Sequence, residues 1–416
     1  MNILFIFKKF IQIGIGLSLV GALNACGGGG PGEVGGAALV GNAVALTVSG
    51  GLQNQSANLL LTSVTVCVPN LSACKTIDNV QVDTGSTGLR LFGSALAGLG
   101  LQRLAGGAAS SSVYECAAFG GGYLWGAMAK ADVKLGQELA SNVSIQLVQD
   151  GSGPSAPFSC TSFGADLGVA GHLGVNGVLG VGPSLQDCGA YCASVAGNGR
   201  YFQCASQGDC IATTAPLASQ AANPVANFTS NNNGVVIDLP SAPPAGARQL
   251  SGQMVFGINT QPNTTINTMA ADITQVLLAK SGLHAGRFSA SLNGILYPDS
   301  TIDSGAGANF FNDPSLPVCG GSAVMAALYC PGDGKSSAVQ VREVLLAGAV
   351  MVTLPVANAS YLFAQPATAF GNLAGPGADG QSTAIRLGLP FFMGRRVYTG
   401  FDTSSNPSGP YFAFKS

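Results

Sequence analysis

The sequence predicts a β-rich protein that is built from two related halves. Of the 416 residues, 60 are Gly, 47% are hydrophobic and only 9% are charged. Short runs of Val, Ile and Leu between Gly-rich turns are typical of strands rather than helices. A D-T-G-S motif begins at Asp83 and a D-S-G-A motif at Asp303. Each motif ends an apolar strand-like segment, which indicates an internal repeat.

The first 25 residues are typical of an export signal. Lys8 and Lys9 supply positive charge, and residues 11–22 are uncharged and mostly apolar. This stretch is shorter than a confident membrane span requires. Residues 23–26 read Leu-Asn-Ala-Cys, which resembles the lipobox of bacterial lipoproteins. An ordinary cleaved signal followed by a chance cysteine is the alternative.

The lipobox resemblance implies that the thiol of Cys26 is acylated, for example with palmitate. Residues 26–44 would then form the acylated cysteine and a Gly-rich flexible tether. The residue after the cysteine is Gly27 rather than Asp, which is similar to the outer-membrane sorting pattern. We therefore expect a monomeric lipoprotein that is anchored in a bacterial outer membrane and faces the periplasm or the cell surface.

Charge and histidine content narrow the partners and cofactors. The sequence holds 17 Lys and Arg against 19 Asp and Glu, so no basic surface for phosphates is predicted and nucleic-acid binding is disfavoured. Two histidines, His172 and His284, are too few for a multi-histidine metal centre. We expect no metal and no cofactor.

Ten cysteines remain besides Cys26. An even number in an oxidising compartment favours disulfides. Cys116 and Cys160 are a candidate long-range pair, and the connectivity stays open at this level. The other spacings look local: Cys67/Cys74, Cys188/Cys192, Cys204/Cys210 and Cys319/Cys330.

Strand-like segments recur along the chain, whereas helical patterns are few. Asn293-Gly294 separates two strand-like segments, 287–292 and 295–297, and predicts a hairpin. Residues 273–280 give the clearest helical pattern. The Pro-rich segment 241–248 is a plausible boundary between the halves. Further strands are expected at residues 64–68, 143–148, 235–239 and 254–258.

The two halves share a longer unit than the Asp triplet. A Leu-Gly dipeptide follows well downstream of each triplet, at Leu179-Gly180 and at Leu387-Gly388, and we expect a turn at both places. A single D-[ST]-G in a Gly-rich chain is most simply a tight turn. Two copies, each closing a strand and each matched to a later Leu-Gly, are a stronger signal.

Paired aspartates would give this repeat a chemistry. Two carboxyl groups held about 3 Å apart cannot both ionise, so they share one proton and one pKa rises. The ionised partner can act as a general base on water, while the protonated partner hydrogen-bonds a substrate carbonyl. The Gly of each triplet allows the two turns to approach without a Cβ clash.

At this point the chain resembles the pepsin-like aspartic peptidases over residues 45–416, in the family's order. Residues 176–182 are similar to the family's D-G-I-L-G-L-G segment, and residues 387–402 are similar to the L-G-D-P-F segment near its C-terminus. Residues 119–126 and 133–136 resemble its flap hairpin and the strand that follows, and residues 252–257 resemble the strand that opens its second lobe.

The resemblance implies an all-β, bilobal pepsin-like aspartic protease fold, with two β-barrel-like lobes and a central cleft. The lobes would span residues 45–245 and 246–416. Asp83 and Asp303 would be the catalytic pair. The residues implied to support the pair are Thr84, Gly85, Ser86, Ser304 and Gly305. Those implied to bind substrate from the flap are Phe119, Gly120, Gly122 and Trp125.

Several positions depart from the family pattern. Ala306 stands where the family has a second Thr or Ser, so one hydroxyl donor to Asp303 is missing. Phe119 replaces the flap tyrosine and Arg90 replaces the tryptophan that this tyrosine usually bonds, which indicates a rewired flap. Arg386 replaces an apolar residue before Leu-Gly. None of these changes removes a carboxylate.

Three functions follow from these observations. The first is an aspartic endopeptidase that hydrolyses peptide or protein substrates with a water activated by the Asp pair. The second is a catalytically weak or inactive lipoprotein of the same fold that binds peptides or a partner protein in its cleft. The third is a Gly-rich envelope protein with fortuitous triplets, in which the two aspartates lie far apart.

Overall fold

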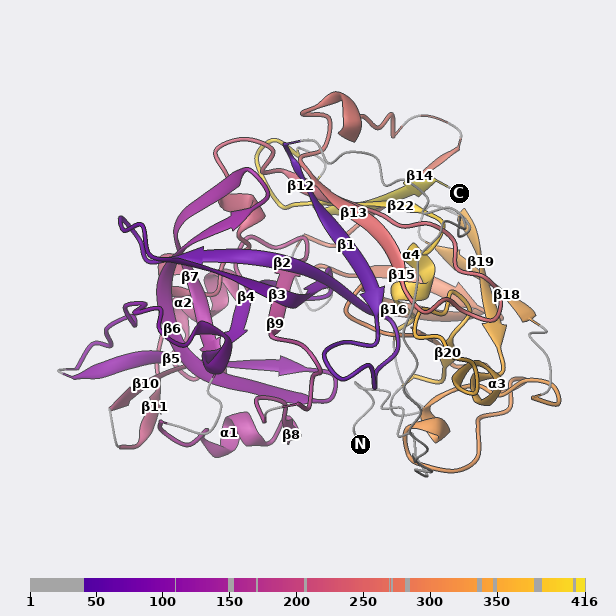
Figure 1. The fold of residues 1–416 in the computed structure, drawn as a ribbon, viewed down its shortest axis with the longest axis horizontal. Helices are drawn as coiled ribbons and strands as arrows, with labels where there is room; N and C mark the ends of the chain where they lie inside the picture. The colour runs from indigo at the N-terminus through magenta and orange to yellow at the C-terminus, as the bar shows by residue number, and fades with distance from the viewer. Residues whose placement is uncertain are drawn as a thin grey trace, which may run out of the picture.

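The computed structural model describes residues 41–415 apart from 109, 149–152, 170, 206–207, 269, 271, 281–284, 335–338, 347–349, 378–383 and 407–408. The export signal, Cys26 and most of the tether lie outside these residues. Within the described residues, no helix is long and apolar enough to span a membrane. Figure 1 shows strands from the first half of the chain, in indigo and magenta, beside orange strands from the second half.

The first half of the chain forms strands β1 (Ala43–Ser49), β2 (Leu59–Cys67), β3 (Cys74–Asp83), β4 (Thr87–Phe92), β5 (Ser111–Phe119), β6 (Gly122–Leu135), β7 (Glu138–Val148), β8 (Ala165–Asp166), β9 (Gly177–Val181), β10 (Tyr201–Ala205), β11 (Cys210–Ala212) and β12 (Gly234–Asp238). The predicted strands at 64–68 and 143–148 fall in the C-terminal parts of β2 and β7, which each begin five residues earlier, and the one at 235–239 coincides with β12 to within a residue.

The second half forms β13 (Leu250–Phe256), β14 (Ile273–Leu277), β15 (Phe288–Leu292), β16 (Ile295–Ile302), β17 (Asn309–Phe310), β18 (Val339–Leu346), β19 (Val350–Ala357), β20 (Ala374–Gly375), β21 (Arg386–Leu387), β22 (Arg396–Gly400) and β23 (Tyr411–Lys415). The predicted hairpin is confirmed, because β15 pairs with β16 and Asn293 and Gly294 have φ angles of 53° and 78°. Positive φ at both central residues is what a type I′ turn requires.

The described helices are short. The α-helices are α1 (Phe158–Thr161), α2 (Gly189–Ser194), α3 (Ala359–Phe363) and α4 (Leu389–Phe392). Single 3-10 turns occur at Gly93–Leu96, Leu217–Ser219, Val225–Asn227, Pro262–Thr264 and Met325–Ala327. The β-rich class predicted from composition is therefore confirmed.

Two local predictions are wrong. Residues 273–280 begin with strand β14, which pairs with β23 from Ile273↔Lys415 to Leu277↔Tyr411, so a distant partner overrides the local helical pattern. Leu179-Gly180 lies inside strand β9 rather than in a turn. A Cβ on Gly180 would lie 2.7 Å from the backbone of Thr87, because β4 approaches too closely for a side chain.

A long sheet joins the two halves of the chain. Its strand order is β11-β10-β5-β6-β7-β4-β9-β3-β2-β1-β13-β12-β22-β23-β14. The halves meet at the antiparallel pair of β1 and β13, from Ala43↔Val255 to Val48↔Leu250, and again where β12 of the first half pairs with β13 and β22 of the second. A second sheet, in the order β19-β18-β15-β16-β21-β17-β20, belongs to the second half. In Figure 1, β1, β12, β13 and β22 run across the region between the two groups of strands.

The repeat seen in the sequence is a repeat in topology. Strand β9 lies between β3 and β4, parallel to the first and antiparallel to the second. Strand β21 lies in the same way between β16 and β17. Each half therefore inserts its Leu-Gly strand between the two strands that flank its Asp turn. This arrangement explains why the Asp triplet and the distant Leu-Gly dipeptide occur together.

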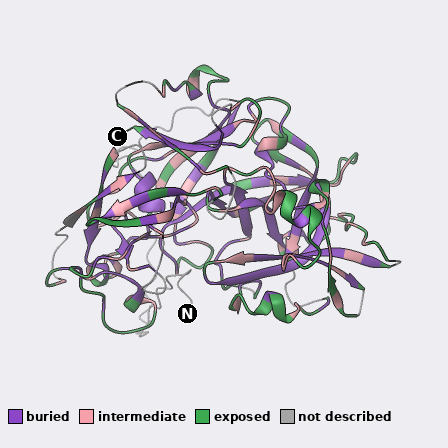
Figure 2. Cartoon of the chain, turned by 180° about the vertical axis from the view of Figure 1, so that it is seen from behind, coloured by how far each residue is buried: buried purple, intermediate pink, exposed green. Residues whose placement is uncertain are grey.

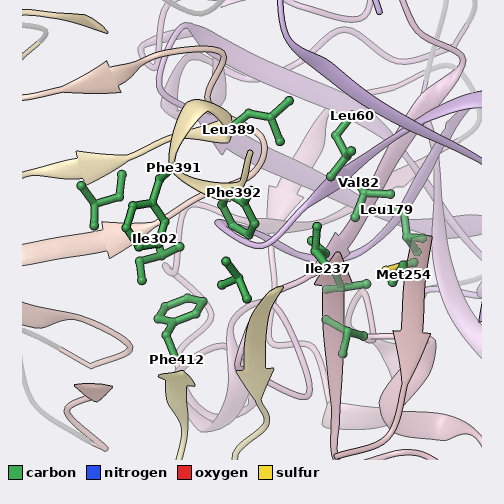
Figure 3. Packing of buried hydrophobic residues seen from close by; sticks show 14 of the residues in the cluster. Leu60, Val82, Leu179, Ile237, Met254, Ile302, Leu389, Phe391, Phe392 and Phe412 are labelled. Carbon is green, nitrogen blue, oxygen red and sulfur yellow. The ribbon is translucent and has the colours of Figure 1, made fainter. Parts of the chain in front are cut away.

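The core is continuous from one half to the other. Figure 3 shows Val82 and Ile302, the residues before the two aspartates, in a buried cluster with Phe391 and Phe392. Figure 2 shows that buried residues follow the strands of both groups, while exposed residues gather on peripheral loops and helices. Both Asp turns are thus supported by fully buried apolar residues, which restrict their movement.

Five disulfides stabilise the described chain, and they are the pairs suggested by the spacings. The long-range bond joins Cys116 of β5 to Cys160 of α1. The local bonds are Cys67–Cys74, Cys188–Cys192, Cys204–Cys210 and Cys319–Cys330.

Candidate active site

Each aspartate occupies the same kind of turn at the end of a strand. Asp83 is the last residue of β3, and Asp303 directly follows β16. The N–H of Gly85 donates to Oδ1 of Asp83 at 2.7 Å, and the N–H of Gly305 donates to Oδ1 of Asp303 at 2.9 Å. The backbone of each turn therefore fixes the orientation of its own carboxyl group.

The two turns meet face to face. A Cβ placed on Gly85 would lie 2.5–2.7 Å from the carboxyl atoms of Asp303, and one on Gly305 would lie 2.5–3.1 Å from those of Asp83. Each glycine thus packs against the carboxyl group of the opposite turn, and any side chain there would clash. Residues separated by 220 positions (303 minus 83) share one site. The reading with fortuitous, distant triplets is wrong.

Reciprocal hydrogen bonds join the two turns behind the carboxyl groups. The hydroxyl of Thr84 donates to the carbonyl of Ile302 at 3.0 Å and accepts from the N–H of Ser304 at 3.0 Å. The hydroxyl of Ser304 donates to the carbonyl of Val82 at 2.9 Å and accepts from the N–H of Thr84 at 3.1 Å. Both side chains are buried. These four bonds are related by an approximate two-fold symmetry and hold the halves in register.

The electrostatics of the pair are those of two carboxyl groups that compete for ionisation. Burial, followed by the charge of Asp303, raises the pKa of Asp83 to about 7, although hydrogen bonds from Ser86 and Gly85 favour its ionised form. Only 6% of Asp83 is exposed. The site therefore retains a proton up to near-neutral pH, which a general acid requires.

The outer oxygens of the two carboxyl groups have different partners. The Ser86 hydroxyl donates to Oδ2 of Asp83 at 2.5 Å. At the matching place in the second half, Ala306 is buried and has no hydroxyl to donate. Instead, Nε of Arg386 lies 3.6 Å from Oδ2 of Asp303. The sequence marked Arg386 as a departure, but only the strand pairing reveals its partner.

The flap predicted at residues 119–126 is a hairpin of β5 and β6, in which Phe119 pairs with Gly122. Phe119 lines a small pocket beside the pair together with Gln81, Asp83, Leu167, Leu173, Val178 and Gly305. Gly120 is exposed at the tip of the hairpin. A Cβ on Gly122 would lie 1.9 Å from the carbonyl oxygen of Ala165, so Gly is needed where β6 meets β8.

The structure places Trp125 away from this pocket. Its indole N–H donates to the carbonyl of Pro154 at 2.8 Å, and only 3% of the residue is exposed. The ring stacks on Tyr114 and meets the ring of Phe202 edge-on, with centroids 5.2 and 5.5 Å apart. These contacts give Trp125 a packing role, and it is not among the residues that line the pocket beside Asp83.

Sequence reasoning missed four residues of the pocket, namely Gln81, Leu167, Leu173 and Val178. The amide of Gln81 donates to the carbonyl of Gly305 at 3.1 Å, which ties β3 to the opposite turn. Leu167 and Leu173 form part of the pocket's apolar wall. Gln81 lies two residues before Asp83 in a strand and could have been assigned to the same face by alternation. Leu167 and Leu173 lie outside regular strands, so no periodic signal marks them.

The structure offers no evident metal centre in its described part. Among the described residues, no three His, Cys, Asp or Glu side chains gather as metal ligands would. His172 is exposed, and its Nδ1 lies 3.0 Å from the carbonyl oxygen of Asp166. His284 lies outside the described residues.

Fold and site together define a class of protein, the bilobal all-β proteins with the pepsin-like aspartic proteinase fold. The crystal structure of an aspartic proteinase from Irpex lacteus is similar to this structure, with a TM-score of 0.51. The similarity covers 90% of this chain and 96% of that chain. The two sequences are 14% identical, so the similarity concerns the fold.

The sequence also assigns the chain to a family. A family model described as "Protein of unknown function (DUF3443)" matches residues 38–414, and the chain belongs to this family. No curated protein matches the sequence.

Proposed function

We propose that this protein is an aspartic endopeptidase, a divergent relative of the pepsin-like enzymes, with Asp83 and Asp303 as its catalytic pair. The observation that carries the proposal is the contact of each carboxyl group with the glycine of the opposite turn. The reciprocal Thr84 and Ser304 bonds support it, since they hold the pair in one geometry. The raised pKa of Asp83 supports a shared proton at the site.

Hydrolysis would use the two protonation states of the pair. The ionised carboxylate takes a proton from water as the water oxygen attacks the peptide carbonyl carbon. The protonated carboxyl group hydrogen-bonds the carbonyl oxygen and gives it the proton, which forms a neutral tetrahedral diol. The C–N bond then breaks, with one proton passing to the leaving nitrogen and one returning to the pair.

The flap supports a peptide substrate rather than a small molecule. Phe119 and its neighbours Leu167 and Leu173 give the pocket beside Asp83 an apolar wall. An extended peptide that carries apolar residues on both sides of the cut fits such a site. Gly120 and Gly122 would let the flap backbone approach the peptide, and Trp125 would support the flap strand from behind.

We further propose that the enzyme acts as a monomer with two lobes, residues 45–245 and 246–416. A lipid on Cys26 would tether it through residues 26–44 to a bacterial outer membrane, where it faces the periplasm or the cell surface. The five disulfides support a location in an oxidising compartment.

A peptide library incubated with the protein between about pH 3 and 7 tests the activity. We expect cleavage by the wild type and loss of cleavage in Asp83→Asn and Asp303→Asn, because each variant removes one proton-transfer group. Equal turnover in all three proteins contradicts the proposal. Binding of the same peptides, carrying a fluorescent label, is measured in parallel.

A specific observation favours a second candidate, a binding protein that lacks efficient chemistry. Ala306 provides no hydroxyl to Asp303, and Arg90 is engaged by Glu115 rather than by a flap tyrosine. Such a protein would bind extended peptides or a partner in its cleft. Peptide binding without cleavage at any pH supports this candidate over the first.

A further inference from the structure

The two halves of the site differ at one register position in their Leu-Gly strands, β9 and β21. In the first half, Val178 of β9 pairs with Gln81 of β3, two residues before Asp83. In the second half, Arg386 of β21 pairs with Thr301 of β16, two residues before Asp303. The chain's own repeat thus has an apolar residue at one copy of this position and a cation at the other.

The strand pairing aims this cation at the second aspartate. Arg386 pairs with β16 on one side and with Phe310 of β17 on the other. The N–H of Asp303 donates to the carbonyl of the next residue, Leu387, at 2.8 Å. The backbones of the arginine and the aspartate are therefore held in fixed register, and Nε of Arg386 lies 3.6 Å from Oδ2 of Asp303.

At Asp303, Arg386 takes the place that the Ser86 hydroxyl group has at Asp83. Oδ2 of Asp83 accepts a hydrogen bond from the neutral Ser86 hydroxyl, while Oδ2 of Asp303 lies beside a permanent positive charge. A cation stabilises a carboxylate and disfavours its protonated form. Among the charged groups of the described residues, Asp83 and Arg386 both face Asp303.

We propose that Arg386 is a positioning residue that keeps Asp303 ionised and so places the shared proton on Asp83. This inference rests on the proposed function. It makes Asp303 the base that takes a proton from water, and Asp83 the acid that donates to the peptide carbonyl. In this proposal Arg386 acts on the water and the peptide only through Asp303. The raised pKa of Asp83 agrees with this division of roles.

The test removes and restores the interaction in the full chain. Arg386→Met deletes the charge, Arg386→Lys keeps it, and Arg386→Met with Ala306→Thr supplies a hydroxyl group to Asp303 instead. Lys134→Met is the matched control, because it removes one positive charge at an exposed site on β6. The Arg386 side chain is 37% exposed, so its replacement opens no core cavity. Ala306→Thr alone adds a donor without touching the arginine.

Two readouts separate the inference from the proposed function. The first is the pH profile of kcat/KM for peptide hydrolysis. The second is the NMR titration of ¹³C-labelled aspartate carboxyl groups, assigned with Asp83→Asn and Asp303→Asn, which needs no turnover. Arg386→Met should move the acidic limb and the first carboxyl titration upward by about one pH unit. Arg386→Lys and the hydroxyl-restoring double variant should move both back toward the wild type, and Ala306→Thr alone should move them downward.

The outcomes are distinct. A titration in Arg386→Met that matches the wild type overturns the role of Arg386, and so does an equal shift in Lys134→Met. A shifted titration without hydrolysis in any protein contradicts the peptidase and leaves the link between Arg386 and Asp303 intact. Hydrolysis with an unshifted titration and pH profile contradicts the link alone.

Discussion

Arg90 and Glu115 form a buried ion pair between β4 and the flap strand β5. Nη2 of Arg90 lies 2.5 Å from Oε1 of Glu115, and the two side chains are 3% and 0% exposed. Arg90 belongs to β4 and Glu115 to the flap strand β5. The guanidinium carbon also lies 5.8 Å from the ring centre of Phe119. The flap is thus joined to the body of the first half by charge and by a cation–π contact.

This pair leads to a prediction about stability. Arg90→Met leaves Glu115 buried without a counter-charge, so we expect the free energy of unfolding to fall by about 3–5 kcal/mol. The neighbouring Asp187 does not take over as the partner of Arg90 in the wild type. Its burial first, and the charge of Glu115 second, raise its pKa to about 8, so this carboxyl group is mostly neutral at pH 7. Urea unfolding of the variant at pH 7 measures the loss.

The double variant Arg90→Met with Glu115→Leu is the control for this prediction. It replaces the ion pair by apolar groups and removes the unpaired charge, so most of the stability should return. A loss below about 1 kcal/mol in Arg90→Met alone would contradict the assignment of Glu115 as a buried charge.

The raised pKa of Asp83 predicts that stability depends on pH. Its folded-state pKa of about 7 exceeds the ordinary value of 3.8, so the native state holds a proton that the unfolded chain releases in between. The stability from this group is complete below about pH 4 and is lost as the pH rises through about 7. Asp83→Asn should therefore be more stable than the wild type at pH 7, by on the order of 2 kcal/mol.

Thermal unfolding from pH 4 to pH 8 checks this expectation. The two proteins should converge toward pH 4, where the unfolded chain of the wild type also begins to hold the proton. Asp402→Asn, a change at an exposed residue, serves as the control and should follow the wild type. A wild type that stays more stable than Asp83→Asn at every pH would contradict the buried, protonated carboxyl group.

The same pKa sets the alkaline limit of hydrolysis. Because the pair needs one proton, kcat/KM should stay high toward neutral pH and fall about tenfold per pH unit above about 7. A fluorogenic peptide assayed from pH 3 to 9 gives the profile. An alkaline limb below pH 5 would mean that the proton is held less tightly than the burial of Asp83 implies.

Much of the fold could be predicted from the sequence because its strongest signals are local or repeated. The Asn293-Gly294 hairpin needs only its own turn chemistry, and the doubled Asp and Leu-Gly units reflect a doubled topology. The helix predicted at 273–280 failed because its apolar residues suit either element. Its strand state depends on a partner near Lys415, which no local window contains.

The residues of the site likewise divide into those that local or repeated sequence signals predict and those that depend on distant strand pairing. Asp83 and Asp303 could be found from the repeated triplets, and the matching hydroxyl residues beside them follow from the same motif. The contact of Arg386 with Asp303 could not, because it depends on the parallel register of β21 against β16. Trp125 shows the opposite case, since its position in the flap strand indicates substrate contact while its indole is buried against Tyr114.

The close approach of the two turns predicts the effect of a single methyl group. Gly85→Ala would place its Cβ within 2.5–2.7 Å of the carboxyl atoms of Asp303 and so push the pair apart. A displacement of about 1 Å can cost 100-fold in rate, and we expect at least that loss in kcat. Gly100→Ala is the matched control, because nothing lies within 4 Å of its added Cβ. Similar kcat values in the two variants would show that the turns are not in contact.

The hydrogen bonds that cross between the halves should be energetically coupled. Thr84→Val keeps the shape of the side chain but leaves the carbonyl of Ile302 and the N–H of Ser304 without their partner. These buried groups should cost about 1–3 kcal/mol in the free energy of unfolding. Ser304→Ala should cost a similar amount, because it leaves the carbonyl of Val82 and the N–H of Thr84 unpaired.

The double variant measures the coupling. Once either hydroxyl group is lost, the two turns can separate slightly and admit water, so the second loss should cost less than it does alone. We expect the loss of unfolding free energy in the double variant to be smaller than the sum of the losses in the two single variants, by about 0.5 kcal/mol or more. Thr65→Val, at an exposed threonine pair, should change stability by less than about 0.5 kcal/mol. Strict additivity between Thr84 and Ser304 would mean that each hydroxyl group stabilises only its own turn, and that the register of the two carboxyl groups is held by the apolar core instead.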